Sequence, residues 1–328
     1  MSPATEADAA LKSETRKRSR WGDSAFRAIA FSAASVVILL LALLLWKLWT
    51  GSLPTIKLLG WKMLIDREWN ADQHLYGALP FIYGTLVTSA IALVLAVPLS
   101  IFTAIYLTDL APTWIRQPLV SVIEMLAAVP SVIWGLWGIF VMVPWLRVAA
   151  FPLLKSVLGP IPGIGVLFSG PIFGIGYLSA GIIVAIMIIP IITAVSREVL
   201  RSVPDLQREA AYALGATRWE VTRIAVLSFA KRGLMGASVL GLGRALGETM
   251  AVTMVIGNSG NISASLFAPG YSLASVIANE FGEAGLEVRF TSALFELGLI
   301  LLGITVLVNI VALLLVRAVT TKGASRPA

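Results

Sequence analysis

The sequence contains no cysteine, a single histidine and few charged residues. Without cysteine there can be no disulfide framework, no catalytic thiol and no cysteine-based metal site. His74 lies beside Asp72 in a connecting segment, and one imidazole cannot build a metal centre by itself. Only 13% of the residues are charged and 58% are hydrophobic, which is not the composition of a soluble globular protein.

Motifs for nucleotide binding and catalysis are also missing from the sequence. No G-x-x-x-x-G-K-[ST] occurs, so we expect no ATP bound through a P-loop. The glycines at 241, 243 and 247 do not fit G-x-G-x-x-G, and they lie inside an apolar run. No cluster of a nucleophile with a base is visible, and no set of metal ligands. We therefore expect a chain that is not an enzyme and binds no metal or cofactor of its own.

Long apolar runs fill most of the chain. Several reach 18 residues or more, which predicts an all-α, polytopic integral membrane protein. Between the third and fourth of these runs lies a proline- and glycine-rich stretch that predicts an interfacial or re-entrant element at 151–176. A short amphipathic helix is predicted near 273–281. The six predicted spans are 28–45, 79–107, 119–143, 178–195, 233–256 and 291–316.

The distribution of basic residues predicts which side of the membrane each segment faces. With both termini in the cytoplasm, 17 Lys and Arg residues fall on the cytoplasmic side and 7 on the other, as the positive-inside rule requires. The net charge of +7 is then a result of topology and does not indicate nucleic-acid binding. We expect a disordered basic cytoplasmic tail at 1–27, a transmembrane domain at 28–317 with a cytoplasmic loop at 198–232, and a cytoplasmic tail at 318–328.

The polar segment 202–232 predicts two short helices joined by a tight turn. Ser202, Pro204 and Asp205 form a helix-start signal, and Gly215 is placed to end that helix. Thr217 and Glu220 have the spacing of a capping box that begins the second helix. An ordinary amphipathic connector has the same shape, and so does a helix-turn-helix DNA reader. Short tethers to membrane spans and scattered basic residues argue against DNA, so no nucleic-acid partner is expected.

Two opposite charges interrupt the fifth apolar run. Arg244 and Glu248 are four residues apart, which places them on one face of a continuous helix where they can pair. Charged residues inside a membrane span usually face a bundle interior or a wet path, although a self-neutralising pair can also serve only to fix helix packing. Gly243 and Gly247 form a G-x-x-x-G, which lets another helix approach closely.

Part of the polar segment resembles the EAA loop of the permeases of ABC importers. The resemblance rests on Glu209, Ala210 and Ala211, followed by Gly215 four residues later. The chain has Ser228 where the family pattern usually has a proline. The resemblance implies that this loop is a coupling helix that docks on an ATPase subunit.

Further strings are similar to the C-type permease subunits of the high-affinity phosphate (Pst) ABC importers. They are GRALGETMAVTMVIGN, YGALPFIYGTLVTS, EMLAAVPSVIWGLWG and FSGPIFGIGYLSAGIIVAIMIIPII, and the similarity extends from Trp61 to Val316. It implies a bacterial inner-membrane complex with an A-type permease, two ATPase subunits that bind ATP and Mg²⁺, and an extracytoplasmic phosphate-binding protein. Arg244 and Glu248 fall where the family has its functionally important charges of span five, which implies a place on the substrate path.

Other functions stay open at this point. The chain could instead be an ABC permease for another oxyanion such as sulfate or molybdate, which a substrate-competition experiment would distinguish from a phosphate permease. An anion channel or ion-coupled carrier without ATPase partners would take up substrate independently of ATP, and the coupling loop argues against it.

Overall fold

The computed structural model describes residues 3–285 and 287–321, and it divides into two units, 1–51 and 52–328. The first unit consists of the larger part of α1 (Pro3–Leu59), whose last residues belong to the second unit. From 22 to 45 nearly every side chain of α1 is exposed, and most of these side chains are apolar, as expected for a helix covered by lipid. The tail predicted to be disordered is therefore helical from Pro3 onward; residues 1–2 and 322–328 of the two predicted tails lie outside the described residues.

The helices of the chain confirm the all-α, multi-pass class. Among the described residues, six helical segments are long and apolar enough to cross a membrane. The strands are two pairs of residues in one antiparallel hairpin, in which Trp69 pairs with Tyr76. The six segments are Gly22–Leu59, Leu79–Leu110, Ser131–Leu158, Tyr177–Arg201, Arg218–Leu246 and Val288–Arg317.

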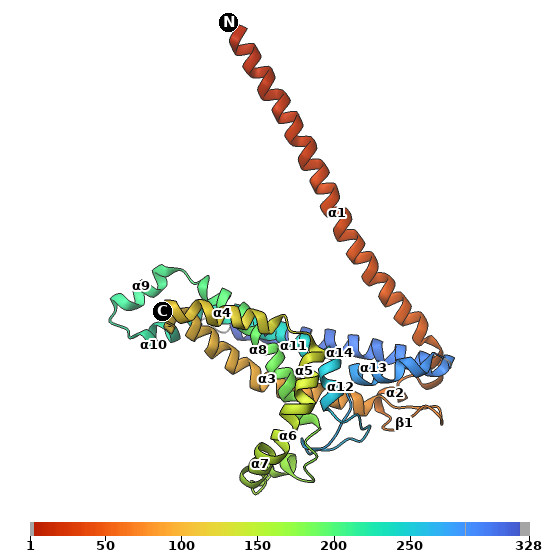
Figure 1. Ribbon diagram of the computed structural model, residues 1–328. Helices are drawn as coiled ribbons and strands as arrows, with labels where there is room; N and C mark the ends of the chain where they lie inside the picture. The colour runs from red at the N-terminus through yellow and green to blue at the C-terminus, as the bar shows by residue number, and fades with distance from the viewer. Residues whose placement is uncertain (1–2, 286, 322–328) are drawn as a thin grey trace. The chain divides into compact units, whose positions relative to one another are not determined.

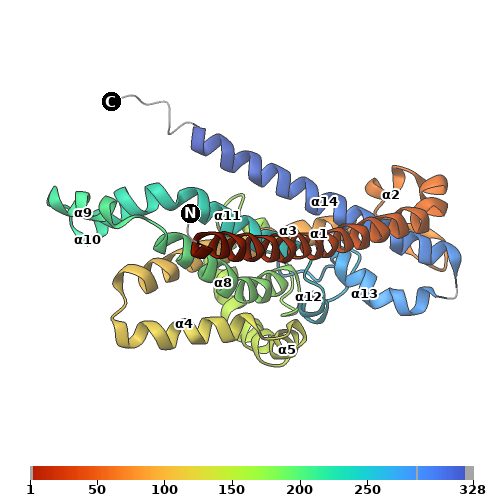
Figure 2. The same cartoon turned by 90° about the horizontal axis from the view of Figure 1, so that it is seen from above.

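The second unit is built around three helices that pack side by side, namely α3, α8 and α11, with α14 against α11 (Figures 1 and 2). In both views α9 and α10 lie at one end of this unit, and the hairpin with α2 and α13 lies toward the other. In chain order its elements are α2 (Lys62–Ile65), β1 (Trp69–Asn70), β2 (Leu75–Tyr76), α3 (Leu79–Ile105), the π-helical turn η1 (Tyr106–Leu110), α4 (Thr113–Ala127), α5 (Ser131–Trp137), η2 (Gly138–Met142), α6 (Val143–Trp145), η3 (Leu146–Ala150), α7 (Phe151–Leu158), the 3₁₀ turn η4 (Gly165–Phe168), α8 (Tyr177–Arg201), α9 (Asp205–Ala213), α10 (Arg218–Val221), the π-helical turn η5 (Thr222–Val226), α11 (Leu227–Leu246), α12 (Met250–Val255), α13 (Leu273–Ala284) and α14 (Val288–Thr321).

The core of the second unit lies along α8. This helix is the most buried of the six long segments, and its buried side chains, such as Ile183 and Ile188, pack against α3 and α12. Small residues allow this close packing: a Cβ at Gly181 of α8 would overlap Ile91 of α3, and one at Gly241 of α11 would overlap Ile192 of α8. A second cluster of buried apolar residues joins α3, α13 and the start of α14 to the hairpin.

The third membrane segment lies further along the chain than the sequence predicts. The helix breaks after Ala127, because Pro130 lacks an N–H and disfavours helical geometry in the residue before it. Helix α4 is therefore separate, and the span runs over Ser131–Leu158 instead of 119–143. The prediction of a re-entrant element at 151–176 is correspondingly wrong in its first part: Pro152 occupies the first turn of α7, where a proline is tolerated, and the helix continues to Leu158.

The polar segment follows the prediction except at its start. Ser202 does not cap the next helix; its hydroxyl donates to the carbonyl of Val199 at the end of α8, and α9 begins at Asp205. Gly215 ends the first helix with a positive φ of 84°, as glycine can. Thr217 and Glu220 form the predicted capping box. The amphipathic helix predicted at 273–281 is α13, which is capped by Ser272.

Candidate functional site

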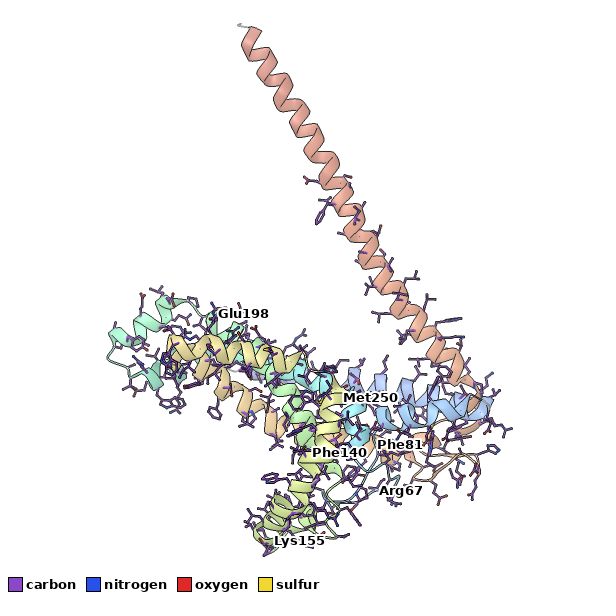
Figure 3. The ribbon with its side chains drawn as sticks, in the orientation of Figure 1. Arg67, Phe81, Phe140, Lys155, Glu198 and Met250 are labelled. Atoms are coloured by element: carbon purple, nitrogen blue, oxygen red, sulfur yellow. The ribbon has the colours of Figure 1, made fainter. Side chains whose placement is uncertain are left out.

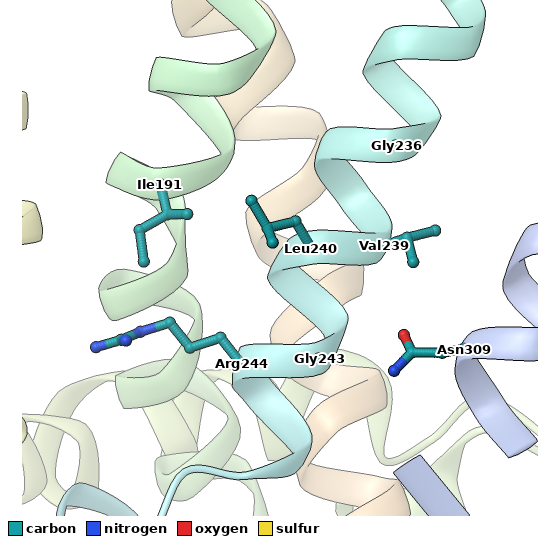
Figure 4. A pocket seen from close by; sticks show the side chains of 7 residues that line it. All are labelled: Ile191, Gly236, Val239, Leu240, Gly243, Arg244 and Asn309. Atoms are coloured by element: carbon teal, nitrogen blue, oxygen red, sulfur yellow. The ribbon is translucent and has the colours of Figure 1, made fainter. Parts of the chain in front are cut away.

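A cavity of about 570 Å³ lies where α8, α11 and α14 meet. Two of its lining residues carry polar side chains, Arg244 and Asn309 (Figure 4). The side chain of Arg244 extends from α11 on the side of α8 that carries Ile191, and Asn309 faces α11 from α14 on the other side. The remaining lining residues are Gly236, Val239, Leu240 and Gly243 of α11. The cavity is thus an apolar groove along α11 with a cation at one wall and an amide at the other.

Arg244 lies in the last turn of α11 and is exposed. The last carbonyl groups of a helix have no partner within the helix, so this end carries a partial negative charge that stabilises a cation. This position reduces the cost of a guanidinium within an apolar segment while leaving its N–H groups free to face an anion.

Glu248 lies just beyond the end of α11 and is 9% exposed. Its carboxyl group is placed to accept hydrogen bonds from the backbone N–H groups of Thr249 and Ala251 and from the hydroxyl of Ser131. Ser131 begins α5 and Ala251 lies in the first turn of α12, so the carboxylate sits at the start of two short helices that pack on one another. The backbone N–H groups at the start of α12 and the hydroxyl at the start of α5 stabilise a negative charge there.

The structure corrects the prediction that Arg244 and Glu248 share one helix face. Helix α11 ends at Leu246, Gly247 is its C-cap, and the next helix starts only at Met250. No ion pair joins Arg244 to Glu248 within the part of the chain that the structure describes. The i, i+4 argument assumed an unbroken helix, and the glycine that was expected to assist packing is where the helix stops.

The glycines of α11 have different surroundings. A Cβ at Gly233 would overlap Val199 of α8, and one at Gly241 would overlap Ile192, so these two permit the close approach. At Gly243 a Cβ would lie 3.9 Å from the amide nitrogen of Asn309, and at Gly247 its only neighbour would be the carbonyl of Gly243. Sequence reasoning missed Asn309; the signal was a lone amide in an otherwise apolar stretch of the last span.

Helix α9 carries the residues of the EAA resemblance on an open surface. None of its residues is buried; Glu209 and Ala210 are exposed and Ala211 is partly exposed. Large apolar side chains are exposed on the same segment: Leu206 is 76% exposed and Leu214 89%. Large apolar side chains exposed close together on one short segment are typical of a surface that contacts another protein. After a short turn that follows α9, the chain continues as one helical segment from Arg218 to Leu246, so Arg244 lies on a rod that begins next to α9.

One ion pair near α9 was also missed by the sequence reasoning. Arg208 of α9 and Asp109 of η1 form a 2.6 Å pair with side chains that are 21% and 11% exposed. Their separation of 99 residues gave no sequence signal, because neither residue lies in an apolar run or a motif.

Comparison with known proteins identifies the family. Residues 96–322 match the family described as the binding-protein-dependent transport system inner membrane component. The phosphate transport system permease protein PstC of Haemophilus influenzae is 47% identical over 304 residues, which are 92% of this chain and 96% of that protein. The chain belongs to the PstC permease family. Its relative of the same description in Mesorhizobium japonicum is 45% identical over 95% of this chain and 96% of that protein.

Family membership gives the cellular location of the chain and the classes of protein with which it acts. It is a multi-pass protein of the bacterial inner membrane, a permease component that acts with ATPase and substrate-binding partners. Solved structures share the fold. A chain of the MetNI methionine ABC transporter in an inward facing conformation has a TM-score of 0.50 and 19% sequence identity. The match covers 74% of this chain and 94% of the transporter chain. A chain of a bacterial ABC transporter involved in import of the acidic polysaccharide alginate has a TM-score of 0.51 and 16% sequence identity. This match covers 87% of the present chain and 96% of the transporter chain.

Proposed function

We propose that this chain is the membrane-spanning subunit through which an ABC importer moves inorganic phosphate into the cytoplasm. The observation that carries the proposal is the identity of 45–47% over more than nine-tenths of the chain to phosphate transport system permeases. The exposed coupling helix supports it, since α9 presents apolar surface for a partner and leads through a short turn into the rod that ends beside Arg244.

The assembly that we propose contains an A-type permease, two ATPase subunits and an extracytoplasmic phosphate-binding protein. ATP and Mg²⁺ would be bound by the ATPase subunits, and this chain would contribute no catalytic residue. Both termini and α9 would face the cytoplasm, with Glu209, Ala210, Ala211 and Gly215 at the ATPase contact.

Arg244 would bind phosphate transiently through the paired N–H groups of its guanidinium. Glu248 would act differently from a simple counter-ion. Anchored at the starts of α5 and α12, it would hold the end of the path in place and, near the passing anion, accept a hydrogen bond from a protonated phosphate oxygen. Sulfate is fully ionised and cannot donate that bond.

The test is ATP-driven phosphate uptake into vesicles that contain the reconstituted complex. In Arg244→Gln we expect uptake to fall at least about tenfold, because a charge-assisted hydrogen bond to the anion contributes roughly 1.5–3 kcal/mol. Assembly and ATP hydrolysis should be retained. Unchanged uptake in the variant would remove Arg244 from the path while keeping the importer.

The substrate itself is decided by competition in the same vesicles. Excess sulfate or molybdate should leave phosphate uptake unchanged. Absence of phosphate uptake by the wild-type complex, with sulfate or molybdate taken up instead, would replace phosphate by another oxyanion; uptake without ATP would indicate a channel or carrier.

A further inference from the structure

A network of polar contacts ties the coupling helix to the loop that follows α3. Arg208 Nη1 of α9 donates to Asp109 Oδ1 at 2.6 Å, and Arg208 Nη2 donates to the carbonyl of Leu200 at 3.0 Å. The hydroxyl of Thr222 in η5 donates to the carbonyl of Arg218 at 3.0 Å and lies 3.4 Å from the second oxygen of Asp109. The carboxylate of η1 is therefore bonded to α9 and also contacts η5. We call Asp109, Arg208 and Thr222 the Asp109 clamp.

The Asp109 clamp replaces the apolar packing that usually holds a helix to its protein. Helix α9 has no buried residue of its own, so it contributes little hydrophobic area to the unit. Asp109 and Arg208, by contrast, are mostly shielded from water. Removing one partner of such a pair leaves the other charge poorly solvated and unpaired, which costs more than loss of an exposed pair.

The position of Asp109 determines where a movement of α9 is transmitted. Along the chain, α9 is connected to α8 before it and to α10 and α11 after it. Asp109 adds a non-covalent connection to α3, because η1 continues α3 as one helical segment from Leu79 to Leu110. Helices α3, α8 and α11 are the three that pack on one another to form the centre of the unit.

We propose that Asp109 is a positioning residue that makes α9 move as one body with α3, so that ATPase-driven motion of the coupling helix reaches all three central helices. This inference rests on the proposed function. With the clamp broken, α9 keeps its chain connections to α8 and α11 and loses its hold on α3. The ATPase subunits would then continue to hydrolyse ATP, but a smaller part of the movement of α9 would reach the central helices and open the path.

The test uses the intact reconstituted complex, measuring phosphate imported per ATP hydrolysed. In Asp109→Asn, which keeps the shape of the side chain, this ratio should fall about tenfold, the factor that corresponds to loss of one charge-assisted hydrogen bond. ATP hydrolysis and assembly should remain. The matched control is Glu198→Gln in the last turn of α8: Glu198 is acidic, exposed and at the same end of the unit (Figure 3), and its carboxylate is not part of the clamp.

Exchanging the charges of Asp109 and Arg208 distinguishes a positioning role of Asp109 from a role in stability alone. The double variant Asp109→Arg with Arg208→Asp restores the attraction in reverse, and a polar cavity of about 310 Å³ beside the clamp gives the longer side chain room. The double variant should recover most of the import per ATP that either single substitution loses. An unchanged ratio in Asp109→Asn, or a double variant no better than the single ones, would overturn the proposal. Failure of both variants to assemble would also overturn it, because the pair would then serve assembly.

A second measurement does not depend on the substrate. The native chain has no cysteine, so two introduced at Thr113 and Gln207 carry the only spin labels on this chain, and partner subunits freed of reactive cysteine complete the complex. The distance distribution between α4 and α9 should be narrow in the wild-type background and broaden with Asp109→Asn; equal widths would contradict the clamp. If the wild-type complex fails to import phosphate while the distances respond as expected, the proposed function fails and the clamp stands.

Discussion

Single partly buried polar groups outside the membrane segments connect the parts of the second unit. Glu280 of α13 is the clearest case: its carboxylate accepts a 2.7 Å hydrogen bond from the indole N–H of Trp69 in β1. Burial raises the pKa of Glu280 above its usual value, the bond from Trp69 lowers it, and the nearby Glu283 raises it further, with burial the largest effect. The folded state therefore favours the protonated form.

This direction of the pKa shift gives a prediction about pH. Because the folded pKa is raised, the contribution of Glu280 to stability is complete below its unfolded pKa and is lost as pH rises through its folded pKa. Glu280→Gln keeps an acceptor for Trp69 and removes the partly buried charge. At a pH above the folded pKa of Glu280, the variant complex should melt at a higher temperature than the wild type. At a pH below the unfolded pKa, the two complexes should melt at the same temperature.

The measurement is the thermal midpoint of the intact complex across the pH range from 4 to 8. Glu68→Gln, an exposed carboxyl before β1, is the control and should melt like the wild type. A Glu280→Gln complex that is less stable at every pH would mean that the charge strengthens the bond to Trp69 by more than its burial costs.

At the scale of elements, close helix packing is concentrated at a few glycines. Gly84 in the second turn of α3 is buried, and a Cβ there would overlap the backbone carbonyl of Tyr271. The next residue, Thr85, accepts a hydrogen bond from the backbone N–H of Leu273 at the start of α13. The first turns of α3 thus hold the segment that leads into α13, and a backbone oxygen cannot move aside as the end of a side chain can.

Gly84→Ala should therefore destabilise the subunit by about 1–3 kcal/mol, the usual cost of overpacking. The amount of assembled complex and its thermal midpoint would show the loss. Gly303→Ala is the matched substitution, since Gly303 lies in α14 with open space where the Cβ would be. It should be neutral or slightly stabilising, because alanine favours a helix by up to about 1 kcal/mol over glycine. Equal behaviour of the two variants would contradict the packing argument.

The elements also show what sequence reasoning could and could not achieve. Apolar runs gave the number of membrane segments, because length and hydropathy define them, but the third and fifth segments are displaced from 119–143 and 233–256 to Ser131–Leu158 and Arg218–Leu246. Local chemistry correctly gave the stop at Gly215 and the capping box at Thr217. Proline predicts a kink or break at Pro98, Pro130 and Pro190, but only Pro130 separates two helices, while α3 and α8 continue through the other two. The break after Leu246 was missed, because glycine also occurs inside α11 and only tertiary packing decides which glycine ends the helix.

The candidate site follows the same division. Arg244 and Glu248 were found because charges stand out in an apolar run, but their separation by a helix break was not visible. Asn309 and the Asp109–Arg208 pair depend on contacts between distant parts of the chain, Asn309 with Gly243 and Asp109 with Arg208. A single sequence carries no direct signal for such contacts.

At the scale of the whole molecule, the lack of cysteine makes the proposed orientation testable. Single cysteines in place of Ser24, Gln207 and Asp72 would each be the only thiol in the chain. We expect a membrane-impermeant maleimide to label Asp72→Cys from outside intact cells, because that residue lies in an exposed connector predicted to be extracytoplasmic. Ser24→Cys and Gln207→Cys should react only after the membrane is opened.

The experiment needs all three variants to import phosphate at wild-type levels, so that labelling reports native topology. Labelling of Ser24→Cys from outside would reverse the predicted orientation of α1. Labelling of Gln207→Cys from outside would remove α9 from the side where ATP is available, and with it the coupling role.

The interruption at 247–249 gives the fifth segment the mechanics of a lever with its fulcrum near one end. The helical rod from Arg218 to Leu246 has 29 residues, and at 1.5 Å per residue such a rod is about 43 Å long. If it tilts by about 10° around the break, its far end moves by about 7 Å, whereas a residue three positions from the fulcrum moves by about 1 Å. A large displacement applied beside α9 is thereby reduced to a small displacement of the backbone at Arg244, with a correspondingly larger force. Such a reduction suits the release of an anion that Arg244 binds only transiently, because a shift of about one ångström is enough to break short hydrogen bonds.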